Sequence, residues 1–226
     1  MRIIIAQDSR TKQWVLTHLM HHLIGDHSTQ EILNHEIVAH LTEQAADLPA
    51  PQPFRNLIAQ VRLGLRQQEH ERFFTELLGG IDEPTAPFGL LDVYRDGAAV
   101  SEARVPLDTR LSDRLRACAR RMGVSLAALC HLAWGRVLAC ISGRREVVFG
   151  TVLIGRMQAG EGADRAMGLF INTLPVRVSI NTVAVSEQVR QMQGLLADLL
   201  RHEHASLATA QRCSGIVAPA PLFTSL

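Results

Sequence analysis

Short apolar stretches alternate with polar ones at the start of the chain. The stretches Arg2–Ala6 and Lys12–His21 are rich in side chains that favour strands, and Asp8–Arg10 between them is typical of a turn. The pattern predicts a β-hairpin whose outer edges need partner strands.

A helical pattern follows the hairpin. Ser28 precedes the amphipathic run TQEILNHEIVAHL, and Glu31 stands three residues later, which predicts a capping box and a helix. A proline-rich loop is expected at residues 45–53. Beyond the loop, the apolar spacing over Phe54–Leu78 predicts one long helix that ends at Gly79–Gly80.

The rest of the chain alternates helices with apolar strands. Helices are predicted at Ser112–Arg121, Ser125–Ile141 and Val185–His204. Strands are predicted around Leu90–Tyr94, at Glu146–Ile154, at Leu169–Val178 and where the closing PLFTSL begins. Buried strands that lie far apart in the sequence indicate a layered α/β or α+β domain.

Composition narrows the class of protein only slightly. A hydrophobic content of 47% with 20% charged residues is ordinary for a globular chain, and a net charge of +1 argues against nucleic acid or an anionic membrane as partner. Lys12 is the only lysine, and the arginines are scattered among acids. No signal peptide or membrane-length apolar run is visible, so a cytoplasmic location is expected.

The sharpest chemical signal is HHLIGDH, His21 to His27, where an apolar strand meets a predicted helix. An imidazole in that position can exchange protons near neutral pH. Alternation along a strand sends His21 and His22 to opposite faces, so only one is expected to reach a reacting group. The same alternation disfavours a metal site in this cluster, and the four cysteines lack zinc-ribbon spacing. His202 and His204 are expected at a helix C-terminus, where the dipole favours a partly charged imidazole.

His21-His22-Leu23-Ile24-Gly25-Asp26 resembles the HHxxxDG motif of nonribosomal peptide synthetase condensation domains, with His27 in place of the final glycine. Four further stretches continue the likeness in order: PFRNLIAQ, the long run Val124–Arg156, GLFINTLPVRV, and RHEHASLATAQRCSG followed by PLFTSL. Together they cover essentially the whole chain. The paired histidines exclude a heterocyclisation domain, which carries aspartates there, and GLFINTLPVR favours condensation over epimerisation.

The resemblance implies a chloramphenicol-acetyltransferase-like fold of two lobes around a tunnel. Residues up to about 90 belong to the N-terminal lobe with the HHxxxD motif, and residues from about 91 to 226 begin the C-terminal lobe. The implied reaction joins an amine to a thioester through an amide bond. Both groups travel on the phosphopantetheine arms of donor and acceptor peptidyl carrier domains, so the chain itself is expected to bind neither cofactor nor metal. Adjoining synthetase domains are further expected partners.

The resemblance also assigns roles to residues. His22 is the expected catalytic residue next to the reacting amine, with His21 beside it. Asp26 is expected to face away from the substrates and to form a buried pair with an arginine. Arg156 and Arg177 both stand at the ends of apolar strands, and the choice between them stays open.

Three further residues are expected to line the tunnel. His27 replaces a glycine that could adopt positive φ cheaply, and Gly25 can take up part of that turn. Asn172 lies on an apolar strand and is expected to be buried and hydrogen-bonded. The substrates and the stereochemical subtype stay open.

The length of the chain bears on activity. Met1 lies only twenty residues before His21 and the chain stops at Leu226, so a truncation at both ends is expected, and with it an inactive isolated chain. The alternative function is therefore a silent remnant or a carrier-interaction module that self-associates through exposed strand edges. A more remote alternative is an O-acyltransferase, because His21 and Asp26 also fit the HxxxxD pattern of glycerolipid acyltransferases.

Overall fold

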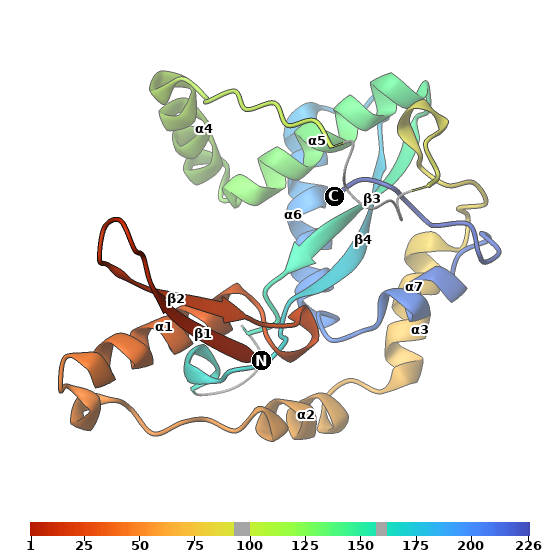
Figure 1. Cartoon of the computed structure of the whole chain (residues 1–226). Helices are drawn as coiled ribbons and strands as arrows, with labels where there is room; N and C mark the ends of the chain where they lie inside the picture. The colour runs from red at the N-terminus through yellow and green to blue at the C-terminus, as the bar shows by residue number, and fades with distance from the viewer. Residues whose placement is uncertain (93–99, 157–161) are drawn as a thin grey trace. The chain divides into compact units, whose positions relative to one another are not determined.

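The computed structural model describes residues 1–92, 100–156 and 162–226, which divide into two units (Figure 1). The first unit contains Met1–Gly64 and Ile154–Ile171, and the second contains Leu65–Leu153 and Asn172–Leu226. A connection between two strands of the second unit therefore completes the first. The lobe boundary expected near residue 90 stays a prediction.

The first unit begins with the predicted hairpin. Strands β1 (Arg2–Gln7) and β2 (Trp14–Leu19) pair antiparallel, with Ile4 opposite Thr17. The Asp8 carboxylate closes the tip, since its Oδ1 accepts the Arg10 N–H at 2.8 Å. Strand β2 ends before the paired histidines, so the predicted strand Lys12–His21 is too long at both ends.

Two helices follow in the first unit, α1 (His27–Leu41) and α2 (Phe54–Leu63). Helix α1 is capped by Asp26, whose carboxylate accepts the Thr29 N–H at 3.1 Å, so the capping box predicted at Ser28 is wrong. An aspartate is as good an N-cap as a serine, and here it comes two residues earlier. A small core joins α2 to the segment 154–171: Leu57, Ala163, Ala166 and Phe170, packed by Phe54 and Val61.

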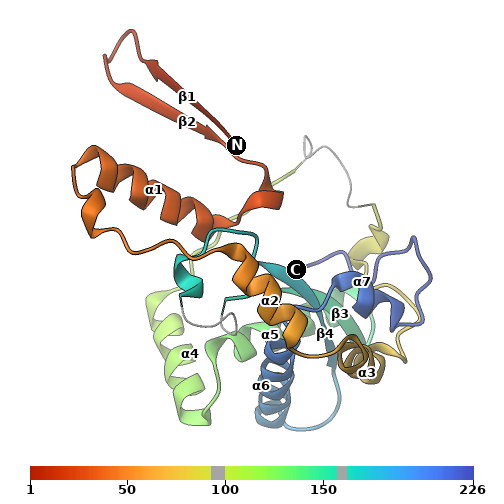
Figure 2. The same ribbon diagram turned by 90° about the horizontal axis from the view of Figure 1, so that it is seen from below.

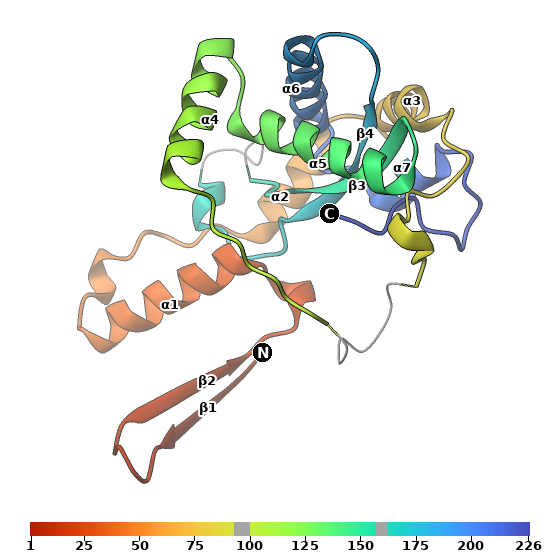
Figure 3. The same ribbon diagram turned by 90° about the horizontal axis from the view of Figure 1, so that it is seen from above.

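The second unit is built on two antiparallel strands, β3 (Glu146–Leu153) and β4 (Asn172–Ser179), with Phe149 opposite Val176. Its helices are α3 (Gln67–Leu78), α4 (Thr109–Met122), α5 (Leu126–Ser142), α6 (Val185–Arg201) and α7 (Leu207–Arg212). Helices α5 and α6 pack on each other and on the strands, while α3 packs on α7 (Figures 2 and 3). Short 3-10 helices occur at His22–Ile24, Ala45–Asp47, Pro87–Gly89 and Ala163–Arg165.

The main core lies between these helices and the two strands. Its largest fully buried members come from α3, α5, α6 and both strands: Phe74, Leu78, Leu138, Val147, Val148, Phe149, Leu174, Val176 and Leu199. Strands buried in this way read as continuous apolar runs, which is why EVVFGTVL and TLPVRV were recognisable. The predicted helices of this unit are confirmed within a few residues, and α7 was not predicted.

The long helix predicted over Phe54–Leu78 is wrong, because the chain breaks between α2 and α3. Gly64 leaves the helical region at ψ −142°. Arg66 then starts α3, and its N–H donates to Glu69 Oε2 at 2.8 Å. Glycine weakens a helix interior by about 1 kcal/mol, and a capping glutamate three residues past the break makes a new start favourable.

Other predicted strands change length or disappear. The strand predicted from Leu169 begins at Asn172. Leu90–Asp92 is not a strand, and Tyr94 lies outside the described residues. The closing segment runs beside β3, where Gly150 N–H donates to Ser225 O at 2.8 Å, but it forms only an isolated bridge with Thr85.

In the described parts of the chain, no single helix is long and apolar enough to cross a membrane. The bent pair α4 and α5 passes the same test of length and composition when the two helices are taken together.

Candidate active site

The paired histidines lie in a tight turn between β2 and α1. His22–Ile24 form one turn of 3-10 helix, and His21 caps it because its Nδ1 accepts the Leu23 N–H at 3.1 Å. The expectation that strand alternation separates His21 and His22 is therefore wrong, since β2 has already ended at Leu19. The two histidines differ in their hydrogen bonds. One ring nitrogen of His21 accepts a backbone N–H, whereas the exposed His22 side chain makes no hydrogen bond to any described residue.

A pocket of about 320 Å³ opens beside this turn. Its walls come from β2, the turn and the start of α1: His18, Met20, His22, Gly25, Asp26, His27 and Gln30. Sequence reasoning missed His18, Met20 and Gln30. His18 precedes His22 by four residues on an apolar strand, and a third histidine so close to the pair was the signal that could have found it.

Asp26 is buried, and both of its carboxylate oxygens are occupied. Oδ1 accepts from Thr29 N–H at 3.1 Å, from Thr29 Oγ1 at 3.3 Å and from Arg156 Nη2 at 3.1 Å. Oδ2 accepts the Phe170 N–H at 3.0 Å. Burial is the largest influence and raises the pKa of Asp26, but these hydrogen bonds together outweigh it and hold the pKa below its ordinary value.

Arg156 is the partner of Asp26, and both side chains are nearly inaccessible. The Arg156 guanidinium also donates to the carbonyls of Ala163 and Ala166, and its Cζ lies 3.9 Å from the centre of the Phe170 ring. One arginine thus ties the turn before α1 to the segment 154–171. Breaking a buried charge pair of this kind leaves one charge without its partner, so the pair holds the turn and the segment 154–171 together.

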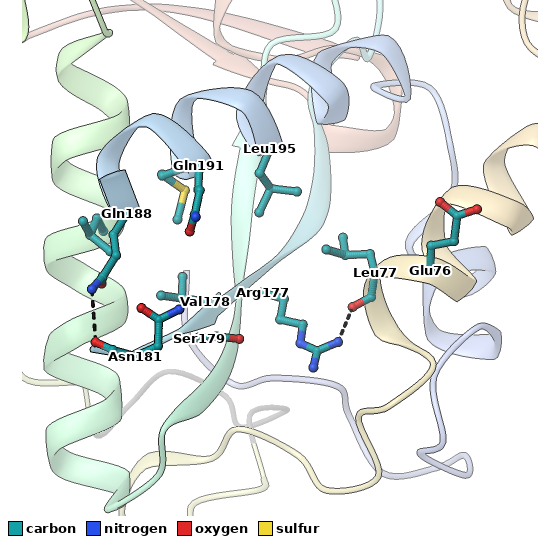
Figure 4. A pocket seen from close by; sticks show the side chains of 11 residues that line it. Glu76, Leu77, Arg177, Val178, Ser179, Asn181, Gln188, Gln191 and Leu195 are labelled. Carbon is teal, nitrogen blue, oxygen red and sulfur yellow. Dashed lines mark hydrogen bonds between the residues drawn. The ribbon is translucent and has the colours of Figure 1, made fainter. Parts of the chain in front are cut away.

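Arg177, the other candidate, has a different partner. Its Nη2 lies 2.6 Å from Glu146 Oε1, and its Nη1 donates to Leu77 O at 3.0 Å. It lines a separate pocket of about 310 Å³ in the second unit, between α3, β4 and α6 (Figure 4). None of the motif histidines lines that pocket.

Gly25 and His27 flank the capping residue. Gly25 has φ −179°, an extended conformation open to any residue, but a Cβ there would lie 2.6 Å from Thr29 Cγ2. The need for glycine is therefore steric. His27 is the first residue of α1 and does not have positive φ, so the histidine causes no backbone strain. Its exposed Nε2 lies 3.3 Å from Glu31 Oε1.

Asn172 begins β4 in the second unit and is half-buried. Its Nδ2 donates to Glu203 O at 2.8 Å and to Ala205 O at 2.6 Å, and its Oδ1 accepts the Thr173 N–H at 2.9 Å. These bonds fix the turn after α6 to the start of β4. A role for Asn172 in lining the tunnel stays a prediction.

His202 caps the C-terminus of α6 as predicted, but it is not partly charged. It is buried, its Nδ1 lies 2.9 Å from His70 Nδ1, and its ring stacks on Phe73 at 4.1 Å. Burial, with help from His70 and Arg201, lowers the pKa of His202 to about 4. Within the described residues, no group of three or more histidine, cysteine or acidic side chains could hold a metal ion.

Comparison with known proteins identifies the class of protein that has this fold and this histidine turn. The family model described as "Condensation domain" matches residues 1–221, and the chain belongs to this family. It is 60% identical over 225 residues to malpibaldin synthetase of Mortierella alpina, a match that covers 100% of this chain and 4% of that protein. It is 32% identical over 196 residues to vanchrobactin synthetase VabF of Vibrio anguillarum, covering 86% of this chain and 7% of that protein.

Solved structures give the same fold. The first condensation domain of the calcium-dependent antibiotic synthetase, solved with a substrate analogue, has a TM-score of 0.70 at 17% identity and covers 91% of this chain. The condensation domain of the monacolin K polyketide synthase MokA has a TM-score of 0.66 at 17% identity and covers 88%. The chain spans 46% and 50% of those two solved chains. The fold is thus the chloramphenicol-acetyltransferase-like fold of condensation domains.

Proposed function

We propose that this chain carries the histidine motif of a condensation domain that forms amide bonds between carrier-bound acyl groups. The observation that supports this most directly is the contrast between His22 and its neighbours. His21 and Asp26 are engaged in local hydrogen bonds, whereas His22 is exposed at a pocket with its imidazole unengaged. An imidazole without a hydrogen-bond partner at a pocket is suited to proton transfer, and His18, whose Nε2 has no described partner either, lies in the same pocket.

The chemistry assigned to His22 follows from that contrast. The amine of the acceptor attacks the carbonyl carbon of the donor thioester, and the C–S bond then breaks. His22 takes the proton that the amine loses and passes it to the departing thiolate, or it holds the amine in place while that proton moves from the amine to the thiolate. Asp26 does not act as the base, because donors already occupy both of its oxygens; it keeps the turn in shape through Arg156.

The reacting groups come from partners. Condensation domains work with carrier domains of nonribosomal synthetases, whose phosphopantetheine arms carry the acyl groups. The proposed partners are one donor and one acceptor peptidyl carrier domain, with adjoining synthetase domains next to them. The hairpin β1–β2 is the surface proposed for self-association, since both of its faces carry exposed apolar side chains.

A second candidate function is a catalytically silent carrier-interaction module. The exposure of the apolar hairpin favours it, because a reaction between two carried groups needs a site protected from water. The acyltransferase alternative has no further support, because the motif that suggested it belongs to the family match.

The two candidates are separated by a graft. Residues 1–226 replace the matching stretch of malpibaldin synthetase, a substitution made practical by the 60% identity. Loaded donor and acceptor carriers are supplied, and the product is read by mass spectrometry of the carrier arms. His22→Ala is expected to lower amide formation by roughly 10²–10⁴-fold, the usual loss of an acid–base group.

The matched control is His35→Ala, an exposed histidine on α1 outside the pocket, which should leave the rate unchanged. Equal small effects of both substitutions would remove the catalytic role of His22. A wild-type graft that binds carriers and forms no amide would favour the silent module.

A further inference from the structure

Helix α4 carries an unusual concentration of arginine. Five of its fourteen residues are arginines, hereafter the arginine face: Arg110, Arg114, Arg116, Arg120 and Arg121. All five are exposed, and Asp113 is the only acidic residue within the helix. At 3.6 residues per turn they spread over the side of the helix opposite Leu115 and the buried Ala119. The expectation that arginines are scattered among acids is therefore wrong for this helix.

Folding accounts for only part of these charges: Arg120 and Arg121 lie in the last turn, where the helix dipole favours cations, whereas Arg110, Arg114 and Arg116 gain nothing from it. Across residues 1–92, 100–156 and 162–226, none of the five forms an ion pair, and the pairs Arg110/Arg114 and Arg116/Arg120 stand at the i,i+4 spacing at which like charges repel. Arg110 also lies at the helix N-terminus, where the dipole disfavours a cation. The helix is held instead by its cap at Asp108 and its apolar side.

The partner that such a surface selects is defined by its chemistry. Guanidinium groups are planar forks that match carboxylates and phosphates alike with two parallel hydrogen bonds, so the length and the local extent of the charge have to choose between them. The helix is about 20 Å long, the length of one helix on a small partner domain. The charge is local, because the chain as a whole has a net charge of only +1 and creates no field for a long polyanion. An acidic protein surface meets these conditions better than nucleic acid does.

We infer that the arginine face of α4 is a docking surface for an acidic face of a carrier domain. The identity of the partner rests on the proposed function, while the sign of its charge rests on α4 alone. Exposed charge contacts of this kind mainly raise the rate at which the partners meet and fix their relative orientation. Because salt screens exposed charges, binding is expected to be sensitive to ionic strength.

The experiment measures the dissociation constant of the 226-residue chain for a phosphopantetheinylated carrier domain taken from malpibaldin synthetase, at low and at high ionic strength. The test variant combines Arg110→Gln, Arg114→Gln and Arg121→Gln. It should bind about tenfold more weakly at low salt, the loss expected for three exposed charge contacts, and its affinity should depend less on salt.

The matched control removes the same charge elsewhere through Arg10→Gln, Arg55→Gln and Arg62→Gln, three exposed arginines of the first unit. It should stay within twofold of the wild type. A second variant with lysine at 110, 114 and 121 keeps the charge and should recover part of the affinity. Equal weakening by the test and control variants would overturn the inference, as would a test variant that binds the carrier normally but loses binding to a DNA duplex.

Failure of this inference can be told apart from failure of the proposed function. If His22→Ala stops amide formation in the graft while the arginine variant binds carriers normally, the docking surface is wrong and the chemistry stands. If the arginine variant loses carrier binding while His22→Ala has no effect, the docking surface stands and the catalytic assignment is wrong.

Discussion

At the scale of single residues, the site is defined by which polar atoms are already occupied. Asp26 is the buried member of the motif, with four donors on two oxygens. Its buried pairing was expected from the motif, but the identity of its arginine could not be read from the sequence, because Arg156 and Arg177 both follow apolar runs and differ only in the partner that the fold brings to them. The motif itself was readable because its spacing is local.

Asp26→Ala should therefore destabilise the chain rather than act on chemistry alone. It strands the Arg156 charge and leaves the Phe170 N–H without its acceptor, at a cost of about 3–5 kcal/mol in unfolding free energy. Urea denaturation at pH 7 measures this, with the exposed Asp47→Ala as control. Wild-type stability combined with lost activity would show that Asp26 is a chemical residue.

The same carboxylate predicts an acid dependence. Its folded-state pKa is lowered, so its contribution is fully present above the unfolded value of about 3.8 and is lost as pH falls through the folded value. The stability difference between the wild type and Asp26→Asn should be large at pH 7 and should shrink below about pH 3.8. A difference that stays constant down to acid denaturation would contradict the assignment.

The buried pair His70–His202 makes the free energy of unfolding depend on pH in a second, higher range. The pKa of His202 falls to about 4 in the folded state, so the unfolded chain binds more protons below its ordinary value of 6.5. Stability is therefore complete above pH 6.5 and decreases toward pH 4, by about 2 kcal/mol at pH 5. His202→Gln should flatten that decrease in unfolding experiments, whereas His35→Gln should leave it unchanged.

At the scale of elements, most helices and both buried strands could be predicted from the periodicity of apolar residues. The errors lie where two local conformations were both compatible with the sequence, or where distant segments pair. One long helix was predicted over Phe54–Leu78 because the apolar spacing is unbroken there, and Gly64, where the helix ends, was given too little weight. The cap at Asp26 was missed because Ser28 offered an equally good local pattern. The isolated bridge between Thr85 and Phe223 depends on contacts between distant segments, which no window of sequence contains.

Gly150 shows how tightly the closing segment lies on β3. A Cβ at this position would lie 2.1 Å from Leu226 Cδ2 and 2.6 Å from Phe223 Cε2. Gly150→Ala should displace the closing segment, and hydrogen exchange of its amides should become faster. Gly194→Ala on α6 is the control, since nothing lies within 4 Å there and an exposed helical alanine should stabilise by about 0.5–1 kcal/mol.

At the scale of the whole molecule, the hairpin is the least protected element. Its exposed apolar residues come from both strands: Ile3, Ile4, Ile5, Trp14, Val15, Leu16 and Leu19. Open strand edges with apolar faces favour association between copies. The chain should therefore form dimers or larger species whose fraction rises with concentration in size-exclusion chromatography with light scattering.

Ile4→Lys combined with Leu16→Lys should shift that equilibrium toward monomer. The control is Val105→Lys, which changes a still more exposed apolar residue outside the hairpin and should have no effect. A wild type that stays monomeric at every concentration would contradict this use of the hairpin.

The first unit is completed by a segment that lies between two strands of the second unit in the sequence, and this has a consequence for biosynthesis. Asp26 and Arg156 are separated by 130 residues, so Asp26 leaves the ribosome long before its partner has been made. At the usual rates of translation the delay is roughly ten seconds, far longer than a helix or a hairpin needs to form. During that interval the nascent histidine turn has its cap bond to Thr29 but lacks its ion pair. The motif becomes rigid only after β3 has been synthesised and the segment that follows it has folded back, so the site stays incomplete until a long stretch of sequence beyond the motif has been made.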